Sequence, residues 1–347
     1  MTKVLTIGSA TMDVFVECDE ANIVSVASKN KSSDFMSYPY GAKIDISGFS
    51  SNVGGGGVNT ACNFANLGFE TSAIFKIGED IYSDGVLEAF KGRKVNLEHI
   101  IQNKETSTGF SIILVSFQGD RTVLAHRGAN AQIMESEINF KAIKDADFLY
   151  VAPLNGESNK VLEPIVDYAH EHGTKICFNA GTTSIKRGFE HIKHILKSAH
   201  IVVMNKEEAM MTTGIQVRPD TKTEKFSHDI IHRDIKKMLT EMKVMDYQII
   251  VITDGGKGAY AYDGQKFYFC PTYPAPVVST LGAGDAFAST FCGALQRTNL
   301  NVGLSLMYAS VNSSSVVSEF GATEGLITFE EIEEKLAHNS EYTYLEG

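Results

Sequence analysis

Apolar and polar positions alternate along the chain in blocks that have the lengths of strands and helices. Short apolar runs predict strands, and the clearest, Ile249-Ile250-Val251-Ile252, suits a parallel strand covered on both faces. The predicted strands are Val4–Ile7, Ser72–Ile77, Asp147–Val151, Lys175–Phe178, His200–Met204, Gln248–Thr253 and Ala259–Tyr262. The predicted helices are Val58–Leu67, Asn159–His170, Phe189–Leu196, Lys206–Thr212 and Asp229–Lys243. This alternation is typical of βαβ units in a doubly wound α/β sheet.

Two segments depart from this alternation. The first, residues 14–51, has no helical spacing and is rich in Ser, Asp, Gly and Tyr. The second holds two strand-like runs, Phe110–Val115 and Thr122–His126, which predict a hairpin. We interpret 14–51 and 108–126 as a small β insertion. The main α/β domain is then expected to comprise 1–13, 52–107 and 127–347.

Composition narrows the class of protein. The 347 residues suffice for such a domain with an appendage, and no apolar stretch approaches the roughly 20 residues of a membrane span. A net charge of −11 disfavours nucleic-acid binding, which needs a basic face. The five cysteines are widely spaced and include no Cys-x-x-Cys pair, which predicts buried thiols in a reducing cytoplasm. The N-terminus is interpreted as a first strand and not as a signal peptide.

The strongest local signal is Gly282-Ala283-Gly284-Asp285, between a strand-like run at Val277-Val278 and a helix marked by Phe287 and Phe291. A helix that starts on small residues exposes backbone N–H groups and favours an anion there. Asp285 in the first turn has two possible roles. It could cap the helix, the role favoured for this motif alone, or take a proton from a nucleophile that attacks a bound phosphate.

Two further glycine-rich segments follow predicted strands or precede a helix. Gly54-Gly55-Gly56-Gly57 leads into the helix that carries Asn59, and its backbone could approach a ligand closely or form a flexible loop. Thr253-Asp254-Gly255-Gly256-Lys257-Gly258 suits both a nucleotide loop and a tight hairpin. Asp13 follows the first strand, where α/β sheets place ligand-binding residues, although a lone loop aspartate is more often a turn residue. A Walker-type phosphate loop and a Gly-x-Ser-x-Gly elbow are both absent from the sequence.

Taken in order, these motifs resemble the ribokinase or PfkB family of sugar and nucleoside kinases, and the resemblance runs from Gly8 to Gly321. The matching motifs are Gly54-Gly55-Gly56-Gly57-Val58-Asn59 for the N-terminal signature, Gly282-Ala283-Gly284-Asp285 for the C-terminal signature, Asn205-Lys206-Glu207-Glu208 for Asn-x-x-Glu, Thr253-x-Gly255-x-x-Gly258 for the nucleotide loop, and Gly128-Ala129-Asn130. The resemblance implies a ribokinase-like three-layer αβα sandwich with a mainly parallel central sheet, in which the β insertion is a lid.

The resemblance also implies roles for individual residues. Asp285 would be the general base, and the backbone of Gly282, Ala283 and Gly284 the anion hole. The substrate hydroxyls would be held by Asp13, Gly55, Gly56 and Asn59. The nucleotide side would comprise Asn205, Glu208, Thr253, Gly255, Gly258 and Asn312. The implied cofactors are ATP and Mg²⁺, with Glu208 holding Mg²⁺ through water.

Two departures from the family pattern bear on cation and substrate. Ser279 stands where the family usually has Asp, so activation by K⁺ is not expected. Gly56 stands where ribokinase proper usually has Lys, which weakens a specific case for ribose. We therefore expect a kinase of a sugar or sugar acid. The alternatives are a nucleoside kinase, with Phe15, Phe110 and Phe117 as candidates for contact with a base, and a non-catalytic sugar or nucleotide sensor.

The resemblance finally implies a cytoplasmic protein that forms a homodimer through its lid. Apolar lid residues such as Phe15, Phe49 and Phe117 would then be covered by the partner. The expected ligand partner is a small sugar or nucleoside, and neither nucleic acid nor membrane is expected as a partner.

Overall fold

The computed structural model describes residues 1–28, 31–116, 121–218, 231–246 and 248–347. Within these residues the largest feature is a ten-stranded sheet. Its strands are β1 (Lys3–Ile7), β6 (Glu70–Ile74), β8 (Val95–Asn96), β12 (Phe148–Val151), β13 (Lys175–Asn179), β14 (Ile201–Asn205), β15 (Ile249–Thr253), β16 (Ala259–Tyr262), β17 (Phe267–Cys270) and β18 (Leu345–Glu346). They lie in the order β18-β17-β16-β15-β14-β13-β12-β1-β6-β8. Pairing is parallel from β15 through β8 and antiparallel from β15 to β18.

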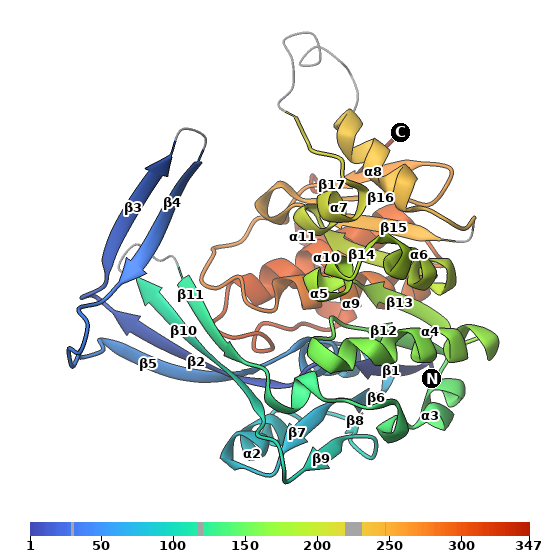
Figure 1. Cartoon of the computed structure of the whole chain (residues 1–347). Coiled ribbons are helices and arrows are strands. Elements are labelled where there is room, and N and C mark those ends of the chain that lie inside the picture. Colours follow the sequence, from blue (N-terminus) through green and yellow to red (C-terminus); the bar gives the residue numbers. More distant parts are fainter. Residues whose placement is uncertain (29–30, 117–120, 219–230, 247) are drawn as a thin grey trace.

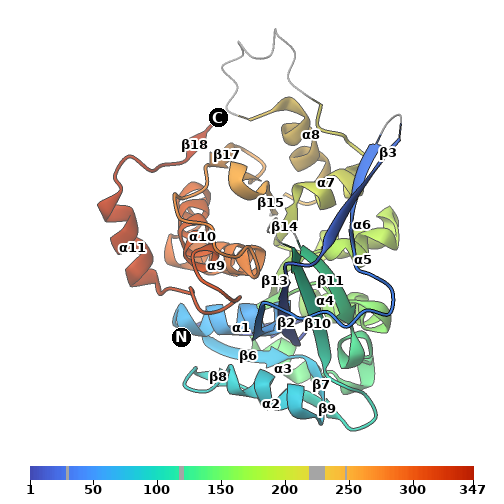
Figure 2. The same ribbon diagram turned by 90° about the vertical axis from the view of Figure 1, so that its left-hand side faces the viewer.

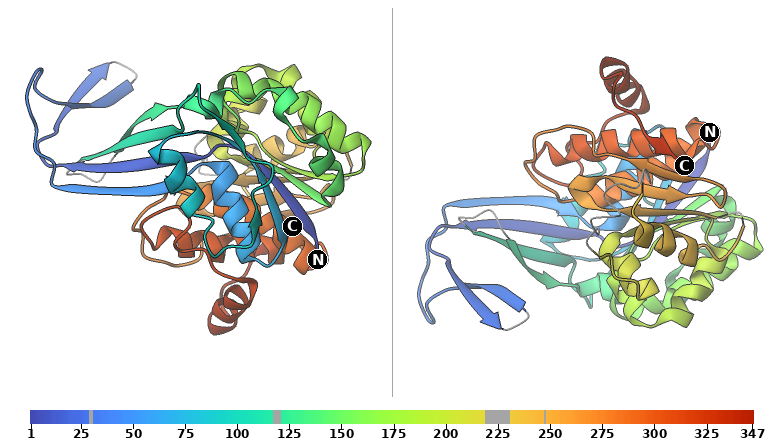
Figure 3. Two further views of the ribbon diagram at one scale, coloured as in Figure 1. Left: turned by 90° about the horizontal axis from the view of Figure 1, so that it is seen from below. Right: turned by 90° about the horizontal axis from the view of Figure 1, so that it is seen from above.

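Helices cover both faces of this sheet (Figure 3). One face carries α1 (Gly56–Asn66), α9 (Ala283–Arg297), α10 (Val302–Val317) and α11 (Phe329–His338). The other carries α3 (Phe140–Asp145), α4 (Leu162–Glu171), α5 (Gly181–Lys186), α6 (Phe189–Ser198), α7 (Lys206–Thr213) and α8 (Arg233–Met242). Strand β12 shows why its sequence is apolar throughout. Leu149 and Val151 point into the core under α4 and α6, and Phe148 and Tyr150 into the core under α9 and α10.

A separate sheet of four strands projects from the main body (Figures 1 and 2). Its strands are β2 (Thr11–Cys18), β5 (Gly48–Gly54), β10 (Gly109–Ser116) and β11 (Arg121–His126), in the order β11-β10-β2-β5. We call these four strands the lid sheet. A hairpin of β3 (Asn22–Ser28) and β4 (Lys31–Ser37) extends beyond it. Beside the lid sheet lie α2 (Ile81–Glu88) and the short pair β7 (Lys76–Gly78) and β9 (Ile101–Asn103).

The expected three-layer α/β architecture with a mainly parallel sheet and a lid is therefore confirmed. No helix in the described ranges combines the length and the apolar character that crossing a membrane requires. Short 3₁₀ turns join several elements. They are η1 (Gly128–Ala131), η2 (Glu135–Glu137), η3 (Gly156–Val161) and η5 (Gly255–Lys257).

Several predicted boundaries were wrong. Val277 and Val278 form no strand; they are exposed, and the N–H groups of Val278 and Ser279 both donate to the carbonyl of Val317. The run predicted over Ser72–Ile77 is divided between β6 and β7. The helix predicted from Asn159 begins as η3 and becomes α-helical at Leu162.

Other differences concern residues whose partners are distant in sequence or that lie outside the described ranges. Helix α8 begins at Arg233, and residues 229–230 of the predicted helix lie outside the described residues. The prediction of buried thiols was wrong for Cys177 and Cys292, which form a disulfide between β13 and α9 at a separation of 115 residues. Cys18, Cys62 and Cys270 are buried free thiols, as predicted.

Candidate active site

One cavity lies between the glycine motif at residues 253–258 and the glycine motif at residues 282–285. Its volume is about 110 Å³, and it lies between the turn after β15 and the start of α9. Its lining residues are Thr253, Gly255, Gly258, Ala259, Thr272, Ala283, Gly284, Phe287, Ser310, Ser313 and Ser314. Gly258 has a φ of +111°, and a Cβ atom there would overlap the carbonyl oxygen of Cys270. Only glycine therefore fits at this turn.

The start of α9 supplies the other wall of this cavity. Its N-cap is Gly282, in the left-handed region with a φ of +74°, and no side chain caps the helix. A Cβ atom on Gly282 would lie 2.7 Å from atoms of Ala322, whereas one on Gly284 would meet no atom within 4 Å. Ala283 and Gly284, the first residues of a 15-residue helix, thus line the cavity with no side-chain cap on their N–H groups, which suits an anion.

Asp285, in the first turn of α9, does not cap the helix. Its Oδ2 accepts a hydrogen bond of 2.8 Å from Nδ2 of Asn59, a residue 226 positions away on α1. Burial raises the pKa of Asp285 above its ordinary value, and the Asn59 amide opposes that rise. The arrangement therefore differs from the capping role favoured by the motif alone and leaves a carboxylate suited to accepting a proton.

The four-glycine segment wraps around the end of β1 and the start of β2. Gly57 N donates to Ser9 O over 2.9 Å, and a Cβ atom on Gly55, whose φ is +95°, would lie 2.5 Å from Ser9 O. A Cβ atom on Gly56 would lie 3.5 Å from Oδ1 of Asp285. The segment is thus an ordered turn beside the Asp285 carboxylate and not a flexible loop.

Asp13 lies on β2 at the other end of the same glycine segment. It is 6% exposed, and the hydroxyls of Ser111 and Thr11 hydrogen-bond to its carboxylate. A Cβ atom on Gly54 would overlap Asp13 Oδ2. Burial raises the pKa of Asp13, and the two hydroxyls oppose the rise. Residues 54–59 therefore contact both Asp13 and Asp285.

Asn205 and Glu208 form a capping box at the start of α7. Asn205 Oδ1 accepts from Glu208 N over 2.8 Å, and Glu208 Oε2 accepts from Asn205 N over 3.1 Å. Asn205 pairs in register with Thr253 of the cavity, and Lys206 is ion-paired with Asp254 in the turn after β15. Burial raises the pKa of Glu208. The box thus fixes Asn205 and Glu208 beside the cavity without being part of its lining.

The prediction that Asn312 lines the nucleotide side needs correction. Its side chain is fully buried, donates to Asn63 Oδ1 and Thr290 Oγ1, and accepts from Ile327 N. It belongs to a hydrogen-bonded network that joins α1, α9 and α10. The cavity is lined instead by other residues of α10, Ser310, Ser313 and Ser314, which sequence analysis missed. Their spacing on an otherwise apolar helix was the only available signal.

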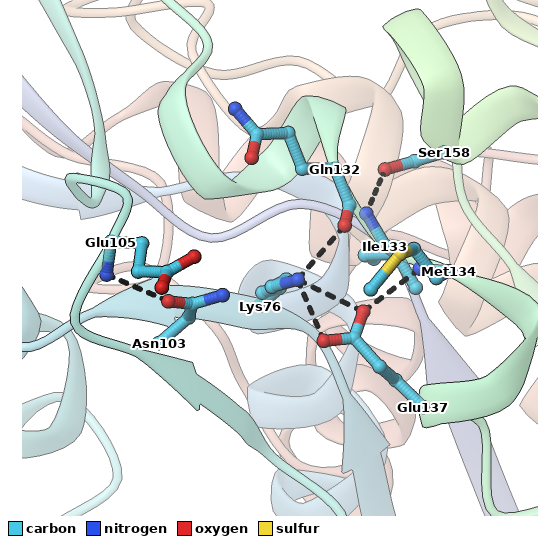
Figure 4. Close-up of polar contacts among 8 residues, drawn as sticks. All are labelled: Lys76, Asn103, Glu105, Gln132, Ile133, Met134, Glu137 and Ser158. Atoms are coloured by element: carbon cyan, nitrogen blue, oxygen red, sulfur yellow. Dashed lines mark hydrogen bonds and ion pairs between the residues drawn. The ribbon is translucent and has the colours of Figure 1, made fainter.

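The segment from η1 to η2 holds the entry to β2 in place. The Asn130 amide donates to Ala10 O over 2.7 Å and accepts from Ala10 N over 2.8 Å. Behind it, the buried Lys76 ammonium donates to Gln132 O and to both oxygens of Glu137, at 2.7–2.9 Å (Figure 4). Ile133 N donates to Ser158 Oγ in the same cluster. Through Asn130 this network fixes the backbone three residues before Asp13.

The lid sheet contacts the main body over the site. Arg121 of β11 donates to Thr280 Oγ1 over 2.9 Å, two residues before Gly282. Phe15 of β2 packs edge-on against Phe320, with ring centroids 4.8 Å apart. The lid sheet therefore closes one side of the space between Asp13 and α9.

The chain is similar in sequence and in fold to known proteins. The chain is 26% identical over 335 residues to the bifunctional ribokinase/ribose-5-phosphate isomerase A of Fructilactobacillus sanfranciscensis, with 96% of the chain aligned. It spans 56% of that longer protein. Among solved structures, Arabidopsis thaliana ribokinase complexed with ribose and ATP superposes with a TM-score of 0.75 at 20% identity, covering 97% of this chain and 99% of that one.

A second solved structure, a Methanocaldococcus jannaschii nucleoside kinase described as an archaeal member of the ribokinase family, gives a TM-score of 0.74 at 18% identity, with 97% and 99% of the two chains covered. These likenesses establish the fold. The model of the pfkB family carbohydrate kinases matches residues 1–328, which is nearly the whole chain. The chain therefore belongs to the pfkB family of carbohydrate kinases, phosphotransferases that act on sugar hydroxyls.

Proposed function

We propose that the protein is an ATP-dependent kinase that transfers the γ-phosphoryl group to a hydroxyl of a sugar or sugar acid. The position of Asp285 carries the proposal. Its carboxylate lies between the glycine segment with Asn59 on one side and the cavity lined by Ala283 and Gly284 on the other. An acceptor hydroxyl and a nucleotide bound on these two sides would meet at this carboxylate.

In the proposed reaction, Asp285 takes the proton of the acceptor hydroxyl. The hydroxyl oxygen attacks the γ-phosphorus in line as the bond to the β–γ bridging oxygen breaks, so that ADP leaves and a phosphate ester forms. The N–H groups of Gly282, Ala283 and Gly284 face the charge that develops on the transferred group. Asn59 keeps the Asp285 carboxylate oriented toward the hydroxyl.

The nucleotide would lie against Thr253, Gly255 and Gly258, with Asn205 near its phosphates. The glycine positions fit this group because a Cβ atom on Gly255 or Gly284 would meet no atom within 4 Å, which leaves their backbone open to the nucleotide. Mg²⁺ would neutralise charge on the phosphates, and it commonly keeps several waters and few protein ligands. Glu208 fits such a role through a water on Oε1, since Oε2 accepts from Asn205. Use of ATP also supports a cytoplasmic location.

The acceptor would lie against Asp13, Gly55, Gly56 and Asn59. The nucleoside kinase remains the second candidate, supported by the fold shared with an archaeal nucleoside kinase. The sensor is the third, and the presence of both Asp285 and Glu208 argues against it. The test is ATP consumption with Mg²⁺ against sugars, sugar acids and nucleosides. Turnover on a sugar or sugar acid supports the proposal, and nucleotide binding without turnover on any member supports the sensor.

We expect kcat/KM to fall at low pH because the general base, Asp285, must be ionised to accept a proton. Burial raises the pKa of Asp285, so kcat/KM is expected to decline at a pH above the usual aspartate range of about 4. Measurement of kcat/KM from pH 4 to 9 checks this. Asp13 and Glu208 also have raised pKa values, so the residual activity of Asp285→Asn serves as the control. If the residual kcat/KM of Asp285→Asn still declines at low pH as in wild type, the decline comes from the titration of another group.

Potassium should have little effect on turnover. Ser279 has a neutral hydroxyl at a position where the family usually has a carboxylate. Its Oγ accepts a hydrogen bond of 3.3 Å from Leu281 N. Replacing a carboxylate by a hydroxyl removes a charged oxygen ligand from any cation site at this position. Replacing Na⁺ by K⁺ at constant ionic strength is expected to change kcat/KM by less than about twofold. A tenfold rise with K⁺ would contradict this expectation.

The outer face of the lid sheet supports a homodimer. Phe49 and Leu124, 66% and 53% exposed, share this face with Val16 and Ile112 by register. We expect a dimer at micromolar concentration, and Leu124→Ser should shift it toward monomer, since each buried leucine contributes about 2 kcal/mol. Val123→Ser is the matched control, because Val123 is similarly exposed on the inner face. Sedimentation velocity measures both, and a monomeric wild-type protein would refute the dimer.

A further inference from the structure

Three polar residues form a row across the inner face of the lid sheet. Asp13 of β2 lies directly opposite Ser111 of β10 and directly opposite Asn52 of β5. Residues opposite each other on paired strands point to the same face of a sheet. Asp13 and Ser111 are already hydrogen-bonded to each other and nearly fully buried. Asn52 is the member of the row with an unused donor.

The unused donor is a buried atom. Nδ2 of Asn52 is inaccessible to solvent and has no hydrogen-bond partner among the described residues. On the other side of the glycine segment, the Oδ1 atom of Asn59 is also buried and lacks a partner within the same residues. The orientation of the Asn59 amide follows from its Nδ2, which donates to the Asp285 carboxylate. One unsatisfied donor and one unsatisfied acceptor thus border residues 54–57.

A hydroxyl group both donates and accepts, so it is the group that would satisfy both atoms. Buried polar atoms are rarely left unpaired, and at a binding site the ligand is the expected partner. Asp13 adds acceptor capacity along the same row, and Ser111, whose O–H is donated to Asp13, keeps an acceptor oxygen. The row as a whole therefore suits a ligand that carries several hydroxyls in succession.

A nucleoside also carries hydroxyls, but it needs an aromatic or apolar surface for its base. Phe110 points to the opposite face of the lid sheet from Ser111 and stacks on Tyr82, with centroids 5.4 Å apart. Phe15 shares the face of Asp13 but is covered by Phe320. Phe117, the third candidate, lies outside the described residues. Neither described phenylalanine offers a free ring to a base.

We propose that Asn52 is a specificity-determining residue that, together with Asp13 and Ser111, binds successive hydroxyls of an open or cyclic polyhydroxylated substrate in preference to a nucleoside. The inference rests on the proposed kinase function and names the substrate class of that same site. Asn52 acts by binding and takes no part in the proton transfer assigned to Asp285.

The test compares Asn52→Leu and Asn52→Ala with wild type, and Ser51→Ala is the matched control on the opposite face of β5. ATP turnover is measured against aldoses, ketoses, alditols and sugar acids, and against adenosine and cytidine. We expect the best substrate to be a sugar, polyol or sugar acid. Loss of one hydrogen bond should raise its KM about tenfold in both Asn52 variants, while kcat and the KM for ATP stay unchanged. Ser51→Ala should match wild type.

Two results would overturn the inference. One is a KM within twofold of wild type in both Asn52 variants, and the other is a higher kcat/KM on a nucleoside than on any polyhydroxylated compound. Calorimetric binding of the same compounds separates this inference from the kinase proposal. One outcome is that wild type binds a polyol without turnover and that this binding weakens about tenfold in the Asn52 variants. This outcome contradicts the proposed kinase activity and supports the binding of hydroxyls by Asn52, Asp13 and Ser111. If the wild-type protein binds no polyhydroxylated compound, the proposed binding of hydroxyls by Asn52, Asp13 and Ser111 is wrong.

Discussion

Asp285→Asn is expected to lower kcat by about 10²–10⁴-fold, the range associated with loss of a positioned general base. Asparagine has the same shape, and its Oδ1 can still accept the hydrogen bond that Asn59 donates over 2.8 Å. Binding of nucleotide and acceptor should therefore persist. Steady-state turnover measures the first effect, and calorimetric titration with ADP and with the accepted substrate measures the second.

The stability of the same variant supplies an internal check. Because burial raises the pKa of Asp285, its ionised form is disfavoured in the folded state, and the stability present at low pH is lost as the pH rises through the raised pKa. At neutral pH the neutral Asn variant should thus melt no lower than wild type. Asp84→Asn is the matched control, since Asp84 is an exposed acid in the first turn of α2. Near-normal turnover in Asp285→Asn would remove Asp285 from the base role.

Gly282→Ala is expected to reduce kcat by about 10²–10³-fold, the loss seen when an anion-stabilising donor is misplaced. A methyl group there would lie 2.7 Å from Ala322, and a φ of +74° is unfavourable for alanine by about 1–2 kcal/mol. The turn that aims the first N–H groups of α9 must then shift. A lower melting temperature should accompany the loss of turnover.

Gly284→Ala separates alignment of the N–H groups from access to the cavity. Its methyl group meets no protein atom within 4 Å, so the variant should fold normally. Because Gly284 lines the cavity, the methyl group should hinder the nucleotide and raise the KM for ATP more than it lowers kcat. Equal kinetic constants in Gly282→Ala and wild type would show that this turn does not stabilise the transferred group.

The fold was predictable because its strands are apolar on both sides. Strand β15 carries Ile249-Ile250-Val251-Ile252 in the middle of a sheet covered by helices, and its bounds were predicted to within one residue. The hairpin of β3 and β4 was not predicted. Its residues are largely exposed, so no buried face imposes an alternating pattern on the sequence.

The site was predictable where a motif is contiguous and not where it depends on packing. The glycines at 255, 258 and 284 do line one cavity, as their motifs suggested. Asn312 does not line this cavity, because packing directs its side chain toward Asn63. The hydrogen bond between Asn59 and Asp285 could not be predicted either, since the two residues lie 226 positions apart and no local pattern links them.

The same separation has a consequence for how the chain is made. Helix α1 is synthesised long before α9 and α10, so the face that will receive them stays uncovered during most of translation. That face presents amides, Asn59 and Asn63, whose eventual partners are Asp285, Ser289, Thr290 and Asn312. Water can satisfy amides in the interval, whereas an exposed apolar seam would invite aggregation of the nascent chain. At Asn59 and Asn63 the uncovered face of α1 is therefore polar, and these two positions add no apolar surface to the nascent chain.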